Sequence, residues 1–312
     1  MGRMIGLRLI DAIPTILLVL TLVFVALRIL PGDPAQVALG DMATPAQLEL
    51  FREQMGLNLP LWQQYFIFLW DMLTLNLGRS LVSNVPVASI IAANLPYTIE
   101  LTLVATGMGV IIGVPLGVLA ATNRNKLPDS GVRVFSLIGY AIPDFYLGAL
   151  MLIVFSLNLG WFPINGGGTD FLSRLHHVFL PALTLAMVKS AFLGRLTRTS
   201  LLEVLGKDYV RTARAKGARE NRVIYRHGLR NALLPVTTGL GLSLLATLSG
   251  SVAIELVFNR PGLGETLIGA IAERDYPVIQ AGAVIFAFFV VFINLLIDIA
   301  YIAIDPRIRV QS

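Results

Sequence analysis

The chain has 312 residues, of which 55% are hydrophobic and only 14% are charged. Soluble domains carry about 25% charged residues, so this composition argues against an ordinary soluble enzyme. The chain contains no cysteine and only three histidines. This excludes thiol nucleophiles and cysteine-ligated metals, and it disfavours a histidine metal site. The net charge of +5 does not indicate a nucleic acid partner, because the basic residues lie between apolar runs and form no nucleic-acid motif.

Six apolar runs fit membrane spans, which take about 20 helical residues each. In chain order they are residues 12–27, 101–123, 134–159, 178–196, 231–254 and 276–297. We therefore expect an all-α polytopic membrane protein with six transmembrane helices. The first helix would occupy residues 1–30, an external helical segment 31–95, and a core with five further helices 96–306.

Lysine and arginine residues are distributed unevenly among the loops that join these runs. Ten of them lie between Arg195 and Arg230, whereas the loops on the opposite side hold five in total. Such residues concentrate in cytoplasmic loops, so we expect a multi-pass protein of the cell inner (plasma) membrane with both termini in the cytoplasm. Arg3 and Arg8 also suit a cleaved signal peptide, but no small-x-small cleavage site follows the first run, which favours a retained helix.

The external segment contains signals for two helices. Thr44-Pro45-Ala46-Gln47 predicts a helix start, since Thr44 and Gln47 form a capping box and proline suits the first turn. Gly56 is a natural end for that helix. A second helix starts at Pro60 and runs through Leu73. We expect this helix to lie at the membrane interface or to pack on the external side, because it is short, contains an aspartate and carries tryptophans and a tyrosine.

Small and charged residues inside the runs indicate packing and function. Gly109, Gly113 and Gly117 are spaced by four, which predicts a face where another helix approaches closely. Lys189 lies well inside the fourth run, and two interpretations stay open. It lines a water-filled path and binds a substrate carboxylate, or it has a structural role. Small residues around Ser249 and Ser251 suit either a dimer seam or the substrate pathway.

Residues 200–232 form the most distinctive loop of the chain. Basic residues alternate with small ones over 208–218, and a second basic stretch runs from Arg222 to Arg230. Membrane topology alone explains the charge of this loop. It does not explain the small residues and Gly217, which predict a compact projecting turn that inserts into a groove on a partner protein.

The sequence resembles the inner-membrane permeases of binding-protein-dependent ABC importers over nearly its whole length. Three ordered blocks carry the resemblance: Leu30-Pro31-Gly32-Asp33-Pro34, the segment 208–217 followed by Arg230-Asn231-Ala232-Leu233-Leu234-Pro235, and Phe258-Asn259-Arg260-Pro261-Gly262-Leu263-Gly264 with residues 274–280. More narrowly, it is similar to the first permease of dipeptide, oligopeptide, glutathione or nickel uptake systems. The family's coupling motif begins with Glu-Ala-Ala, where this chain has Arg211, Thr212 and Ala213.

The resemblance implies a type I ABC importer permease fold whose basic turn docks on an ATPase. The docking residues that it implies are Glu203, Asp208, Tyr209, Arg211, Thr212, Ala213, Arg214, Ala215, Lys216, Gly217, Ala218 and Arg222. The implied partners are a second homologous permease subunit, two cytoplasmic ABC ATPase subunits, an external substrate-binding protein and membrane lipid. Contacts with the binding protein are expected at Asn259, Arg260, Asp275 and Tyr276.

We expect no ATP site, cofactor, metal or catalytic group in this chain. A P-loop needs glycine, four residues and then Gly-Lys-Ser/Thr. Gly206-Lys207 fails this test, because Asp208 follows it and Leu201 stands where the first glycine belongs. ATP and Mg²⁺ are therefore expected at the partner ATPase subunits.

The resemblance implies uptake of dipeptides or oligopeptides, with nickel, glutathione or another small solute as alternatives. An ion-coupled secondary transporter is the rival hypothesis, and it requires intramembrane ionisable sites or inverted repeats. Only Lys189 lies well inside a run, and the sequence shows no inverted repeat. A membrane enzyme would need clustered acid, base or metal groups, which the sequence does not offer.

Overall fold

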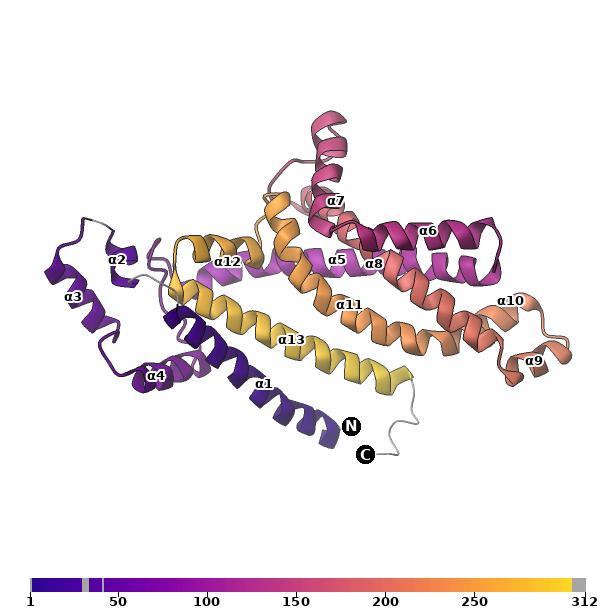
Figure 1. The fold of residues 1–312 in the computed structure, drawn as a ribbon, viewed down its shortest axis with the longest axis horizontal. Helices are drawn as coiled ribbons and strands as arrows, with labels where there is room; N and C mark the ends of the chain where they lie inside the picture. The colour runs from indigo at the N-terminus through magenta and orange to yellow at the C-terminus, as the bar shows by residue number, and fades with distance from the viewer. Residues whose placement is uncertain (1, 30–33, 41, 305–312) are drawn as a thin grey trace. The chain divides into compact units, whose positions relative to one another are not determined.

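The protein is helical throughout the part that the structure describes. The computed structural model describes residues 2–29, 34–40 and 42–304, and within these ranges the extended pairing is limited to one bridge between Arg79 and Pro86 (Figure 1). The predicted all-α class is confirmed. The elements are α1 (Gly2–Ile29), α2 (Pro34–Leu39), α3 (Pro45–Gln54), α4 (Leu61–Leu73), α5 (Val87–Thr122), α6 (Leu127–Ala141), α7 (Asp144–Met151), the π-helical η1 (Leu152–Asn158), α8 (Phe171–Leu205), α9 (Asp208–Ala215), α10 (Glu220–Arg222), the π-helical η2 (Val223–Leu229), α11 (Arg230–Val257), α12 (Leu263–Ala272) and α13 (Tyr276–Ile304).

The chain divides into two compact units. Unit 1 comprises residues 1–96 and 262–295, and unit 2 comprises residues 97–261 and 296–312. Each unit has apolar cores of its own. In unit 1, the start of α5 packs with α12 and α13, and α1 packs with α4. In unit 2, α5, α8 and α11 share two buried clusters.

Four helices are long and apolar enough to cross a membrane. They are α5, α8, the continuous stretch 220–257 and the part of α13 over 276–297. A fifth span results if α6 and the helix that follows it are counted together. Helix α1 has 28 residues, of which Ile13–Ile29 form an apolar helix shorter than the other four. The sixth span therefore stays a prediction.

The third predicted span, 134–159, is not one straight helix. The chain bends by 101° between Leu127–Ala141 and Asp144–Asn158. Ile142, which precedes Pro143, has an extended conformation with φ −95° and ψ 122°. A residue before proline disfavours the helical conformation, because the proline ring clashes with its backbone. The predicted third span, which Asp144 interrupts in the sequence, is therefore two helices joined by a sharp bend.

Helices α3 and α4 begin and end where the sequence predicts. Thr44 and Gln47 form the capping box at the start of α3, and Gly56, just beyond its end, has φ +64°. Helix α4 follows Pro60 directly and packs on α1. Phe24 and Phe68 lie 5.7 Å apart between ring centroids. This contact fixes α4 alongside the C-terminal half of α1.

The glycine stripe of α5 lies against α8, as its spacing predicts. A Cβ atom added to Gly113 would lie 2.8 Å from the carbonyl oxygen of Ser190, and one added to Gly117 would lie 2.5 Å from that of Gly194. Both distances are too short for a carbon atom. The two backbones therefore approach to a distance that only glycine permits.

We predict that Gly117→Ala lowers the free energy of unfolding of the purified chain by about 1–3 kcal/mol, the usual cost of overpacking. The added methyl group has no space between α5 and α8. Gly107→Ala is the matched control, since an added Cβ meets nothing within 4 Å there. Equal stability of both variants in denaturant titrations would contradict the assigned contact.

Candidate functional site

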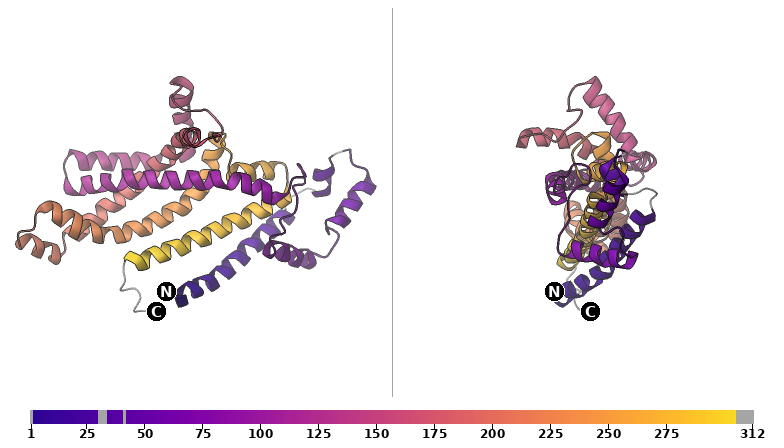
Figure 2. Two further views of the ribbon diagram at one scale, coloured as in Figure 1. Left: turned by 180° about the vertical axis from the view of Figure 1, so that it is seen from behind. Right: turned by 90° about the vertical axis from the view of Figure 1, so that its left-hand side faces the viewer.

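A short helical turn projects from the end of α8. Helix α9 follows α8 after Gly206 and Lys207, and Gly217 reverses the chain with φ +79° before α10. Figure 1 and the left view of Figure 2 show α9 and α10 beyond the end of the long helices of unit 2. An added Cβ at Gly217 meets no atom within 4 Å, so backbone conformation rather than crowding calls for glycine there.

Buried apolar side chains hold this turn to the long helices. Val210 of α9 and Val223 of η2 are both fully buried. The Tyr209 hydroxyl accepts a hydrogen bond from Asn231 Nδ2 at 2.8 Å. Beneath them, a cluster joins the ends of α5, α8 and α11 with η2. Its buried members are Val118, Ala121, Leu201, Ile224 and Ala232. The turn is therefore attached to the long helices of unit 2 by packed apolar contacts.

The outer surface of the turn is strongly basic. Residues 207–230 include eight lysines and arginines against two acidic residues. Arg214 Nη2 lies 2.6 Å from Glu220 Oε1, which ties α9 to α10. Hydrogen bonding to this carboxylate raises the pKa of the Arg214 guanidinium. Arg211 pairs loosely with Asp208 at 3.5 Å, and its side chain is 73% exposed. Its charge is thus available to a partner.

Most of the predicted docking residues lie on this outer surface. The exposed ones are Glu203, Asp208, Tyr209, Arg211, Thr212, Arg214, Ala215, Lys216, Gly217 and Arg222, and the half-buried ones are Ala213 and Ala218. Glu203 lies apart from the others, on the last turns of α8, where it pairs with Lys207 at 3.0 Å. Sequence reasoning missed Val210 and Asn231, which anchor the turn. The buried side of a helix of eight residues gives too short a pattern to identify them.

A buried carboxylate fixes α6 to α8. Asp129 is fully buried and accepts hydrogen bonds from Arg198 Nη2 at 2.9 Å and from the Asn125 backbone N–H at 2.9 Å. Arg133 adds a looser contact at 3.8 Å. The pair closes the short connection between α5 and α6. Sequence reasoning did not single out Asp129, because its partner lies 69 positions away.

The candidate pathway residues lie on α8 and α11. Lys189 is 7% exposed, and its Nζ donates to the Ser243 carbonyl oxygen at 3.3 Å. This contact fits the structural interpretation of Lys189, and a substrate contact stays a prediction. Ser251 is buried and donates to the Leu248 carbonyl oxygen at 2.9 Å, whereas Ser249 is exposed.

A cluster of charges joins α5, α8 and the end of α11. Glu100 Oε2 accepts hydrogen bonds from Arg260 at 2.9 Å and from Arg174 at 3.1 Å. Both guanidinium groups lie over the ring of Tyr97, at 5.4 and 5.0 Å from its centroid. Beside them, Glu255 is fully buried and accepts from the Thr98 hydroxyl at 2.7 Å.

The four residues predicted to contact a binding protein differ in exposure. Arg260, Asp275 and Tyr276 are 1%, 3% and 5% exposed, and Asp275 accepts hydrogen bonds from the Ser80 hydroxyl and the Leu81 N–H. Asn259 is exposed and has φ +40°. In this conformation, Asn259 is the member of the four that offers a surface to a partner.

Comparison with known proteins assigns the chain to a family. Residues 113–310 match the model described as "Binding-protein-dependent transport system inner membrane component", and residues 1–102 match the model of the N-terminal part of such components. The chain belongs to this permease family. It is the permease subunit of an ABC importer, of the dipeptide and oligopeptide type.

Relatives align over nearly the full permease. A glutathione transport system permease protein of Pectobacterium atrosepticum is 45% identical over 302 residues, 97% of each chain. An oligopeptide transport system permease protein of Bacillus subtilis is 44% identical over 304 residues, 96% of each chain. Among solved structures, an inward-facing methionine ABC transporter matches with a TM-score of 0.57 at 19% identity, over 70% of this chain and 98% of the other. That match confirms the permease fold.

Membership in the family carries general consequences for this permease. It is a multi-pass protein of the inner membrane. ABC importer permeases work with ATPase and substrate-binding protein partners. Among the described residues, no group of three or more histidine, aspartate or glutamate side chains is placed to hold a metal ion.

We predict that Val210→Asp exposes the projecting turn of the permease to protease. A carboxylate at this fully buried position cannot stay in the apolar contact with η2, so α9 detaches. Trypsin should then cut after Arg211 and Arg214 several times faster in membranes with this side accessible. Ala215→Asp introduces the same charge at an exposed site of α9 and should leave the cleavage rate unchanged. Equal rates in both variants would exclude Val210 as the anchor.

We predict that Arg260→Leu lowers the free energy of unfolding of the permease by about 3 kcal/mol, since it leaves a carboxylate without its buried partner. Arg174→Leu removes the more exposed partner of Glu100 and should cost at most about 1 kcal/mol. Denaturant titration of the two purified variants measures both losses. The buried pair is not a stabilising contact if Arg260→Leu proves as mild as Arg174→Leu.

Proposed function

We propose that this permease subunit imports short peptides that an external binding protein delivers. The similarity of 44–45% to permeases of oligopeptide and glutathione transport, over almost the whole chain, supports this substrate class. Glutathione, itself a tripeptide, is the second candidate substrate. Nickel and other small solutes are alternatives with less support, since the two relatives named above are a peptide and a glutathione permease.

The projecting turn is the single feature that carries the proposed coupling. It combines a rigid attachment through Val210 and Val223 with an outward surface of basic side chains. A surface of this kind suits insertion into a groove on an ATPase subunit. We place the docking contacts at Asp208, Tyr209, residues 211–218 and Arg222, with Glu203 at their edge. ATP and Mg²⁺ belong to two such ATPase subunits, and this chain hydrolyses nothing.

The distribution of charge supports the proposed orientation. The turn and both termini would lie in the cytoplasm, because the segment with the highest density of lysine and arginine stays inside. Residues 31–95 would then lie outside, together with the loop at Asn259, where the binding protein would dock. A second, homologous permease subunit would complete the substrate pathway, with Ser249 and Lys189 as candidate lining residues.

Helix α8 connects the two ends of this mechanism. Its 35 residues span about 52 Å at 1.5 Å per residue. At one end it continues almost directly into α9, and near the other end it carries Arg174 of the charge cluster. A displacement of α9 by the ATPase would therefore reach the Glu100 contacts through one rigid element. ATP binding would shift the population between inward and outward states, since the ATPase binds the two states with different affinity.

We predict that deleting Thr212 to Ala218 abolishes ATP-dependent peptide uptake by the assembled transporter in proteoliposomes. Uptake should fall to the level without ATP, because the docking surface is gone, while the amount of chain in the membrane stays unchanged. Arg124→Glu, a charge change in another loop of the same side, should retain uptake. Persistent uptake in the deletion variant would overturn the coupling assignment.

The rival ion-coupled mechanism has its own test in the same vesicles. An uncoupler that dissipates the proton gradient should leave ATP-driven uptake intact. Loss of uptake with ATP still present would favour the secondary transporter.

A further inference from the structure

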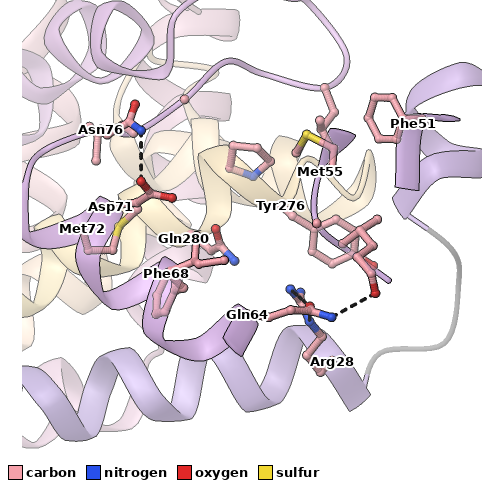
Figure 3. Close-up of a pocket in the computed structure, with 17 residues that line it drawn as sticks. Arg28, Phe51, Met55, Gln64, Phe68, Asp71, Met72, Asn76, Tyr276 and Gln280 are labelled. Carbon is pink, nitrogen blue, oxygen red and sulfur yellow. Dashed lines mark hydrogen bonds between the residues drawn. The ribbon is translucent and has the colours of Figure 1, made fainter. Parts of the chain in front are cut away.

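A cavity lined by apolar side chains and a few polar ones lies within unit 1, among α1, α4 and the start of α13. Its volume is about 200 Å³. Figure 3 shows Asp71 and Asn76 on one side of the cavity, and Arg28 and Gln64 on the other. Tyr276 and Gln280 also line it. None of these side chains belongs to the projecting turn or to the charge cluster of unit 2.

One side of the cavity carries a positive charge. Arg28 is half-buried at the end of α1, and its guanidinium carbon lies 4.9 Å from the centroid of the Phe24 ring. Its Nε and Nη2 donate to Gln64 Oε1 at 3.0 and 2.7 Å. Gln64 is neutral, and no carboxylate among the described residues pairs with Arg28. Because no described carboxylate pairs with it, this half-buried cation favours a ligand that brings an anionic group.

The opposite side of the cavity carries a negative charge that also has no charged partner among the described residues. The Asp71 carboxylate is half-buried and accepts a hydrogen bond from Asn76 Nδ2 at 3.0 Å. No lysine or arginine of the described part of the chain pairs with Asp71. The two opposite charges thus line one cavity, each held by a neutral amide. Gln64 and Asp71 lie two turns apart on α4, about 10 Å along the helix.

A third polar group supports a ligand between these two charges. The Tyr276 hydroxyl belongs to a side chain that is only 5% exposed, and it has no hydrogen-bond partner among the described residues. A buried hydroxyl without a partner costs about 1–3 kcal/mol. Because Tyr276 lines the cavity, a peptide group bound there can supply the missing partner.

We propose that this cavity binds a short peptide with free ends, with its ammonium group at Asp71 and its carboxylate at Arg28. An extended chain advances about 3.3–3.6 Å per residue, so three residues cover the spacing of about 10 Å along α4. The ammonium and phosphate of an ethanolamine headgroup are only a few bonds apart and do not reach both charges. This inference rests on the proposed substrate class. It adds a site on the permease itself that binds both peptide termini.

Binding of blocked peptides tests the assignment directly. The full chain is purified with its partner subunits and without the binding protein, and its affinity for trialanine, N-acetyl-trialanine and trialanine amide is measured. Each block should weaken binding about tenfold, the loss expected for one charged hydrogen bond. Arg28→Gln should abolish discrimination against the amide and keep discrimination against the acetylated peptide. Asp71→Asn should show the converse pattern.

Matched variants and a competitor separate the possible outcomes. Arg274→Gln and Glu273→Gln remove exposed charges elsewhere in unit 1 and should leave both discriminations unchanged. Arg28→Lys keeps the cation and should retain discrimination against the amide, which distinguishes charge recognition from misfolding. Equal affinity for free and blocked peptides would overturn the site. Displacement of trialanine by glycerophosphoethanolamine would do so as well and would assign the cavity to lipid.

Failure of the proposed peptide site can be distinguished from failure of the proposed function. If Arg28→Gln and Asp71→Asn show the opposite patterns of discrimination described above, but no ATP-driven uptake is seen, the peptide site is supported and the transport mechanism is overturned. ATP-driven uptake without any discrimination between free and blocked peptides would overturn the site and leave the transport mechanism intact.

Discussion

Close approach of backbones around α8 organises unit 2. Lipid offers no hydrophobic force between helices, so their association depends on packing and hydrogen bonds. Gly113 and Gly117 let α5 reach the carbonyl groups of α8. From α6, Gly139 lies so near that an added Cβ would be 2.6 Å from Ala191 Cβ, and Ser136 donates to the Ala191 carbonyl oxygen at 3.1 Å. Helix α8 is therefore the element against which the other helices of the unit pack.

Charged contacts fix α8 near both of its ends. Arg174 and Arg198 each bind a carboxylate from another helix, Glu100 and Asp129. The two arginines are 24 residues apart, about 36 Å along the helix, which exceeds the hydrocarbon thickness of about 30 Å. Both pairs can thus lie at the borders of the membrane, where charge is tolerated. Under the proposed coupling, α8 would connect the projecting turn to the charge cluster at its other end.

Features set by neighbouring residues were predictable from the sequence, and those set by distant partners were not. The capping box of Thr44 and the glycine stripe of α5 follow from spacing alone, and both are confirmed. The bend at Pro143 had a local signal in the Pro143-Asp144 pair, which the prediction of one span did not use. Arg260 was expected to contact the binding protein, but it is buried. Its partner Glu100 lies 160 positions away, and no local pattern indicates that pairing.

Because the chain has no cysteine, labelling or crosslinking of one introduced cysteine reports on that position alone. The most direct measurement is crosslinking of Thr212→Cys in the assembled transporter, with Asn259→Cys as the control for the other side of the membrane. We predict an adduct between position 212 and an ATPase subunit, and labelling of position 259 by an impermeant maleimide added outside intact cells. Labelling of position 212 from outside, or no ATPase adduct, would contradict the docking of this turn.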